Sequence, residues 1–149
     1  MSEPSSNLAN PVLPPTAAER RLRARKTPMS LRVNVFTRGP DGEMLLVDLD
    51  PVDRHKELAG FESYRRRLYG SPAARTLGLQ ILPTLDGGDV CVEGAELERL
   101  RAEAELALAN VDLFVVEADA TAEDLRPRFD NIIAAARRAA SMGGGVVIW

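Results

Sequence analysis

The 149-residue sequence contains one cysteine, Cys91, and one histidine, His55. A single cysteine excludes a disulfide within the chain, and one histidine among loop carboxylates is a weak ligand set for a metal. No stretch reaches the ~18 consecutive apolar residues of a membrane-spanning helix, and the N-terminus lacks the apolar stretch of a signal peptide. The sequence therefore predicts a cytoplasmic protein that uses no metal and no cofactor.

Charge is distributed unevenly along the chain. Residues 1–30 have a net charge of +3, and the remainder holds 14 Lys and Arg against 20 Asp and Glu, a net charge of -6. An acidic body disfavours a nucleic-acid partner, because such binding depends on neutralising phosphates. It favours a basic protein partner, or solubility alone.

Residues 1–29 contain five prolines and few large apolar side chains, with a basic cluster at residues 20–26. Such a composition cannot bury enough apolar surface to order itself. We expect a flexible basic arm over residues 1–29 and a single domain over residues 30–149. The arm could contact nucleic acid or an anionic surface, although a solvated tail is the favoured interpretation.

The two ends of the predicted domain carry the clearest patterns. Apolar runs at residues 31–37 and 43–50 are separated by Gly, Pro and Asp, which predicts a β-hairpin. Apolar positions recur at helical spacing over residues 129–140, and three glycines then predict a helix C-cap. The uncharged run at residues 146–149 predicts a buried strand paired within the sheet.

Helix-forming residues dominate the middle of the chain. The predicted elements are a polar connection over 51–60, a helix from 61 or 62 to 70, a short helix over 72–77, a long helix from 95 to about 116, and a last helix with Asp124 as its N-cap and Pro127 in its first turn. A strand at 111–116 is the alternative for the end of the long helix. The predicted fold is α+β: an antiparallel sheet with an N-terminal hairpin and a C-terminal strand, covered by a C-terminal antiparallel helix pair.

Catalytic signatures are absent from the sequence. The Asp86-Gly87-Gly88-Asp89 segment lacks the lysine of a phosphate loop and the carboxylate spacing of an EF-hand, so a plain turn is favoured. No G-x-S-x-G motif marks a serine nucleophile. Cys91 lies between two valines, which predicts a buried and inert thiol, and His55 is expected to be an exposed loop residue.

Acidic residues gather along the long helix predicted after Glu93 and beyond its end. Such a run is either a solvated helix face or a docking surface for a basic partner. If it is a docking surface, Glu96, Glu103 and Asp112 are the candidate partner-binding residues. Reversing their charge is expected to slow association and to leave the fold intact.

The stretch that begins Gly60-Phe61-Glu62-Ser63 and ends in GGGVVIW at residues 143–149 resembles a family of small uncharacterised bacterial proteins. That resemblance implies no activity and assigns no functional residue. In size, acidity and lack of a catalytic motif, the chain is also similar in type to the immunity proteins of bacterial toxin systems. This second likeness implies binding and neutralisation of a basic toxin.

Three functional hypotheses follow. The favoured one is a non-catalytic protein-interaction protein, for instance an immunity protein. The second is a small enzyme whose site is assembled from scattered residues, namely His55, Asp48, Tyr64 and Arg65. The third is a nucleic-acid accessory factor that uses the basic arm. The sequence leaves the oligomeric state open.

Overall fold

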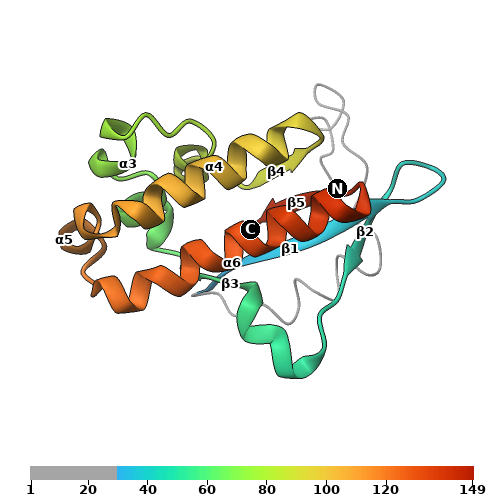
Figure 1. Ribbon diagram of the computed structural model, residues 1–149, viewed down its shortest axis with the longest axis horizontal. Coiled ribbons are helices and arrows are strands. Elements are labelled where there is room, and N and C mark those ends of the chain that lie inside the picture. The colour runs from blue at the N-terminus through green and yellow to red at the C-terminus, as the bar shows by residue number, and fades with distance from the viewer. Residues whose placement is uncertain (1–29) are drawn as a thin grey trace, which may run out of the picture.

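The computed structural model describes residues 30–149, in which helices cover one face of an antiparallel sheet (Figure 1). The strands are β1 (Ser30–Arg38), β2 (Met44–Val47), β3 (Leu58–Phe61), β4 (Val90–Glu93) and β5 (Gly145–Ile148). This confirms the prediction of a mixed α+β fold with an antiparallel sheet and helices in the C-terminal half. The predicted arm at 1–29 lies outside the described residues.

Two long helices pack against each other over the sheet and run in opposite directions (Figure 1). The α-helices are α3 (Pro72–Thr76), α4 (Ala95–Ala109), α5 (Val115–Ala118) and α6 (Ala122–Met142), and the short 3-10 or π turns are η1 (Pro51–Glu57), η2 (Arg65–Tyr69), η3 (Leu82–Asp86) and η4 (Val111–Leu113). No helix between residues 30 and 149 has the length and apolar content that crossing a membrane requires.

The C-terminal strand lies inside the sheet, whose strand order is β2-β1-β5-β4, with β3 paired to the first part of β1. Val146 of β5 is opposite Val35 of β1 on one side and Val92 of β4 on the other. All four residues of β5 are buried. The uncharged ending of the sequence therefore forms a strand that is paired on both sides, as that composition predicts.

Side chains alternate between the two faces of the sheet. Val33 and Val35 of β1 and Ile148 of β5 point into the main core, which they share with α4 and α6. Phe36, Val147 and Trp149 point the opposite way and form a second, smaller hydrophobic cluster. A strand residue and its neighbour face opposite sides, so β1 and β5 contribute to both clusters.

The caps of α6 come from specific side chains. Thr121 is its N-cap, because the Thr121 hydroxyl accepts a hydrogen bond from the Asp124 backbone N–H at 3.1 Å. The prediction of Asp124 as N-cap is wrong by one turn, and Pro127 consequently lies inside the helix. The C-terminal prediction is confirmed: Gly143 has a φ of 67°, which a side chain would disfavour, and ends the helix.

Other predicted boundaries are wrong. Residues 51–60 are the turn η1 followed by most of β3, and the helix expected from residue 61 is only the turn η2. The helix expected over residues 95–116 ends at Ala109, because the Asn110 side chain donates to the Leu106 carbonyl oxygen and competes with helical bonding. Residues 111–116 then form η4 and the start of α5, so they are not a strand either.

Tyr69 provides a pH test of this core. Its hydroxyl donates to the Ala59 carbonyl oxygen at 2.6 Å, and complete burial raises the pKa of Tyr69 above its usual value. Because the folded-state pKa is raised, this contribution to stability is complete below about pH 10 and is lost as the pH rises further, at ~1.4 kcal/mol per pH unit. We expect the free energy of unfolding to fall less steeply with pH in Tyr69→Phe than in the wild type above about pH 10. The free energy of unfolding is measured by urea titration at several pH values. The same dependence on pH in the wild type and in Tyr69→Phe would contradict this expectation.

A candidate protein-binding surface

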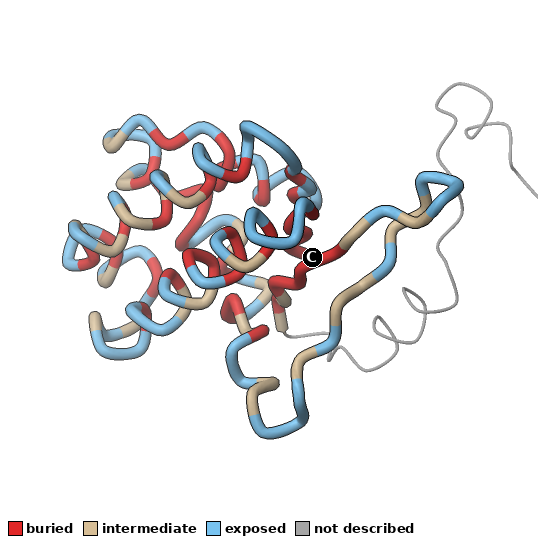
Figure 2. The backbone as a smooth tube through the Cα atoms, turned by 45° about the vertical axis from the view of Figure 1, so that its right-hand side comes forward, coloured by how far each residue is buried: buried red, intermediate tan, exposed pale blue. Residues whose placement is uncertain are grey.

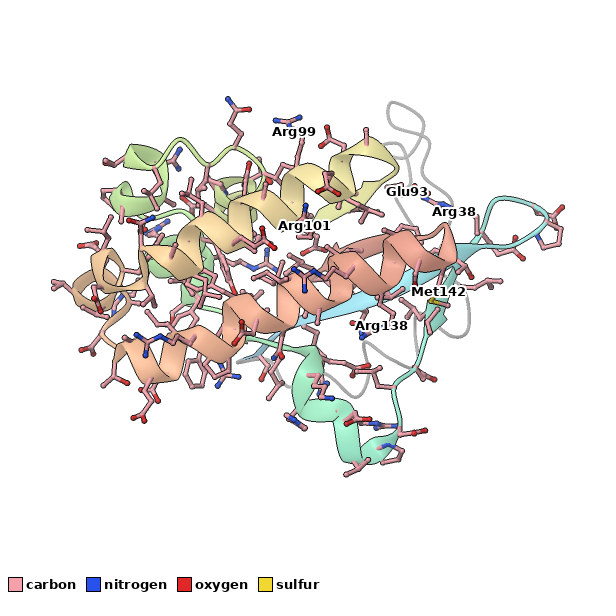
Figure 3. The ribbon with its side chains drawn as sticks, in the orientation of Figure 1. Arg38, Glu93, Arg99, Arg101, Arg138 and Met142 are labelled. Carbon is pink, nitrogen blue, oxygen red and sulfur yellow. The ribbon has the colours of Figure 1, made fainter. Side chains whose placement is uncertain are left out.

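The acidic residues of α4 are largely paired with arginines. Glu96 accepts from Arg99 at 2.9 Å, and Glu105 accepts from Arg101 of α4 at 2.7 Å and from Arg137 of α6 at 3.1 Å. Figure 3 shows Arg101 on the side of α4 that faces α6, and Arg99 on the opposite side. The negative charge of α4 is therefore matched locally, which weakens the prediction that this helix attracts a basic partner.

Glu103 has a role within the fold. Its carboxylate accepts hydrogen bonds from the backbone N–H groups of Gln80 at 2.8 Å, Ile81 at 2.9 Å and Leu82 at 3.0 Å. These donors precede or begin η3, and the carboxylate satisfies them where the chain has no regular partner. These hydrogen bonds argue against the expectation that the charge of Glu103 can be reversed without harm to the fold.

We expect Glu103→Lys to lower the free energy of unfolding by about 3 kcal/mol or more, since hydrogen bonds to a charged group contribute ~1.5–3 kcal/mol each. Glu96→Lys makes the same charge change at an exposed ion pair on the same helix, and is expected to change stability by less than about 1 kcal/mol. Urea unfolding at neutral pH measures both. Equal midpoints for the two variants would show that the carboxylate does not hold the 80–82 segment.

A different acidic surface lies beyond α4, at residues 110–124, which we call the acidic tip. It has no Lys or Arg, and its five carboxylates are all exposed: Asp112, Glu117, Asp119, Glu123 and Asp124. Within residues 30–149, no arginine or lysine forms an ion pair with any of them. The tip therefore carries negative charge that the described fold does not neutralise.

Apolar side chains are exposed among these carboxylates. Leu113 is 53% exposed and Val116 is 86% exposed. Beside Val116 is an open depression of about 510 Å³, lined by Val115, Val116, Asp119, Ala120, Thr121 and Asp124. Figure 1 shows α5 at one end of the molecule, away from β2, and Figure 2 colours many of the residues at this end as exposed. The tip thus offers a partner two exposed apolar side chains that are surrounded by negatively charged carboxylates.

Buried neighbours anchor the tip to the core. Val111, Phe114 and Ala118 are buried, and the Phe114 ring lies 5.5 Å from that of Phe129 in α6. Buried and exposed residues are therefore mixed along one short segment. The buried side chains hold the backbone in place, so the exposed Leu113 and Val116 have defined positions on the surface. Of the predicted partner-binding residues, only Asp112 belongs to this surface.

Arg65, one of the residues of the scattered-site enzyme hypothesis, has a structural role. Arg65 bonds to Glu62, to Asp89 and to the carbonyl oxygens of Leu85 and Gly88, all at 3.1 Å or less, so it ties the turn at residues 85–89 to η2. Its interactions do not include His55 or Asp48.

The other members of that hypothesis differ in environment. Tyr64 is buried, which raises the pKa of its hydroxyl, and its ring packs edge-on against Phe61. His55 is exposed on η1, and Asp48 is exposed after β2. Within residues 30–149, no three His, Cys, Asp or Glu side chains are grouped as metal ligands.

Cys91 differs from its prediction. Its side chain is exposed, because Val90 and Val92 take the core-facing positions of β4 and the intervening residue must face the other way. The flanking valines predicted a buried Cys91. In a strand, however, their burial shows only that the alternate positions face the core, and Cys91 lies between those positions.

Comparisons of the chain with protein-family models, with curated proteins and with solved structures found no match. They give no support to the resemblance based on the GGGVVIW ending or to the likeness to immunity proteins. Any functional conclusion therefore depends on the surface itself.

Sequence reasoning missed Leu113 and Val116. They belong to a run of six residues, 111–116, of which only Asp112 is charged, and such a run favours a buried interpretation. The available signal was the charge pattern: residues 110–124 contain five carboxylates and no Lys or Arg, whereas α4 has two arginines among its four acidic residues.

Proposed function

We propose that the protein is a non-catalytic interaction protein that binds a basic protein partner through the acidic tip. The observation that carries the proposal is the pairing of exposed Leu113 and Val116 with five carboxylates that have no cationic partner within residues 30–149. Apolar anchors supply most of the binding energy in protein interfaces, and complementary charge accelerates the encounter.

Neutralisation of a basic toxin is one form that this binding could take. A tip that covers a basic active surface would block it without any turnover, so the binding protein needs no catalytic group of its own. An interface of the usual size buries about 800 Å² on each partner. The tip would form the centre of such an interface, and neighbouring residues would supply the rest of its area. Leu106, exposed on the last turn of α4 just before the tip, is one such neighbour.

A paired capture experiment tests the proposal. Wild-type protein, the tip variant Leu113→Ser/Val116→Ser and the control Val52→Ser are used as baits in lysate of the native host, and bound proteins are quantified by mass spectrometry. Val52 is exposed on η1 and lies outside the tip. We expect one stoichiometric basic protein with the wild type and the control, and its loss with the tip variant.

Retention of the same protein by the tip variant would place the binding surface elsewhere. If the protein neutralises its partner, the captured protein should lose its own activity when it is mixed with the wild-type chain at a one-to-one ratio. The wild-type chain should be recovered unchanged. Continued activity of the captured protein at saturation would reduce the proposal to binding alone.

A further inference from the structure

The second face of the sheet, away from α6, is buried although it carries no described helix. Its cluster consists of Phe36, Val147 and Trp149, with Met44 and Leu46 partly buried against it. Phe36 is 0% exposed, Val147 4% and Trp149 6%. Every member belongs to β1, β2 or β5 or directly follows β5, whereas the main core draws residues from the helices as well.

The contacts within this layer do not account for its burial. Trp149 Nε1 donates to Asn34 Oδ1 at 2.9 Å, and the Arg38 guanidinium lies 5.0 Å from the centre of the Phe36 ring. Arg38 also pairs with Glu93 at 2.7 Å (Figure 3). Side chains on one face of a sheet stand side by side and point the same way, so they shield each other laterally and leave their tips open. A second layer has to cover them.

We propose that residues 1–29 bind this face and supply the second layer. The segment continues directly from Ser30, the first residue of β1, and β1 carries Asn34 and Phe36 in the middle of the face. An extended segment of 29 residues reaches roughly 95 Å, whereas strands lie only ~4.8 Å apart, so reach is not limiting.

The composition of the segment fits an aromatic surface. Leu8, Val12 and Leu13 lie among Pro4, Pro11, Pro14 and Pro15. Proline-rich segments lose little conformational entropy on docking, and they recognise surfaces lined by aromatic rings. Trp149 and Phe36 provide such rings. The proposal and the expectation of a solvated tail predict opposite results for Trp149, since a tail would leave its ring accessible to water. The proposal is independent of the binding function of the acidic tip.

Crosslinking from Cys91 tests the proposal in the full chain. Cys91 is opposite Val147 in the β4–β5 register and faces the same side, with its side chain exposed. A benzophenone-maleimide probe is attached to Cys91, the protein is irradiated, and the crosslinked peptides are mapped by mass spectrometry. The control carries the probe on α4, in Cys91→Ser/Leu106→Cys.

We expect crosslinks within one chain from Cys91 to peptides of residues 1–29, and none to those peptides from the control position. Crosslinks between two chains would assign the face to a second copy of the protein and overturn the proposal. Absence of any crosslink to residues 1–29 would overturn it as well.

Quenching of Trp149 fluorescence by acrylamide provides an independent measurement, because Trp149 is the only tryptophan. We expect the quenching constant to rise several-fold in Leu8→Ser/Val12→Ser/Leu13→Ser and to stay unchanged in Arg20→Gln/Arg21→Gln/Arg23→Gln. The two triple variants alter the same segment, but only the first removes apolar side chains. An unchanged quenching constant in the first variant would contradict the proposal, and the crosslinking result stands even if that variant fails to fold.

Discussion

Deleting residues 146–149 is expected to abolish the cooperative unfolding transition of the protein. β5 pairs with β1 on one side and β4 on the other, so its removal separates these two strands as well as emptying the core. Burying one large apolar side chain contributes ~1.5–3 kcal/mol, and the loss of four such residues is comparable with the ~5–15 kcal/mol that stabilises a typical domain. Far-UV circular dichroism during heating measures the transition.

A single methyl group tests the same packing in the full-length chain. A Cβ added at Gly144 would collide with the backbone carbonyl of Phe36 in β1, whereas a Cβ added at Gly88 would meet open space. We expect Gly144→Ala to lower the free energy of unfolding by about 2–3 kcal/mol, because the backbone must shift to make room. Gly88→Ala, the matched control, is expected to change it by less than about 1 kcal/mol. Equal stability of the two variants, measured by urea unfolding, would contradict the close approach of β5 to β1.

If the proposed basic partner binds at the tip, Val116→Asp is expected to weaken its binding by about 100-fold, since truncation of a central interface anchor commonly costs ~2 kcal/mol or more and the new carboxylate must also be desolvated. Val116 is 86% exposed, so the change should leave the fold intact. Most of the loss should be a faster dissociation rate, because apolar contacts act after the encounter. Surface plasmon resonance with the captured partner measures both rates.

Val52→Asp is the matched control for this prediction. Val52 is 77% exposed on η1, and the substitution makes the same chemical change outside the acidic tip. It should leave the dissociation rate unchanged. A similar loss of affinity in both variants would indicate a general effect of added charge and would remove Val116 from the interface.

The elements of the core could be predicted from the sequence more accurately than the turns and short strands between them. β1 alternates sharply, α6 has a wide apolar face ending at three glycines, and β5 is uncharged, so each element is specified by its own residues. β3 could not be predicted, because its pairing depends on β1, and η2 is a single turn held by Arg65 contacts with the 85–89 segment. Contacts distant in sequence, rather than local propensity, decide these segments.

The candidate surface was predictable only in part. Asp112 was selected as one of the acidic residues along the long helix predicted after Glu93, and it does lie on the tip. Glu103 was selected by the same criterion, yet its carboxylate binds three backbone N–H groups from the 80–82 segment. The sequence shows where carboxylates occur. It does not show which of them pair with an arginine or accept hydrogen bonds from backbone N–H groups in the folded protein.

The most direct test of the account compares two pairs of carboxylates that carry the same charge. Asp112→Asn/Glu117→Gln removes two of the five negative charges of the tip and leaves the first turn of α6 intact, where Glu123 and Asp124 stabilise the helix end. Glu96→Gln/Glu98→Gln makes the same change in net charge on α4, where both acids are paired with arginines. The measurement is the association rate constant for the basic partner at low and at high salt.

The account predicts that the tip variant associates about 10-fold more slowly than the wild type at low salt and that its association rate depends less on salt than that of the wild type. The α4 variant should behave as the wild type does at both salt concentrations. Equal slowing of the two variants would show that only the overall charge matters, and unchanged association of the tip variant would contradict the acidic tip as the binding surface.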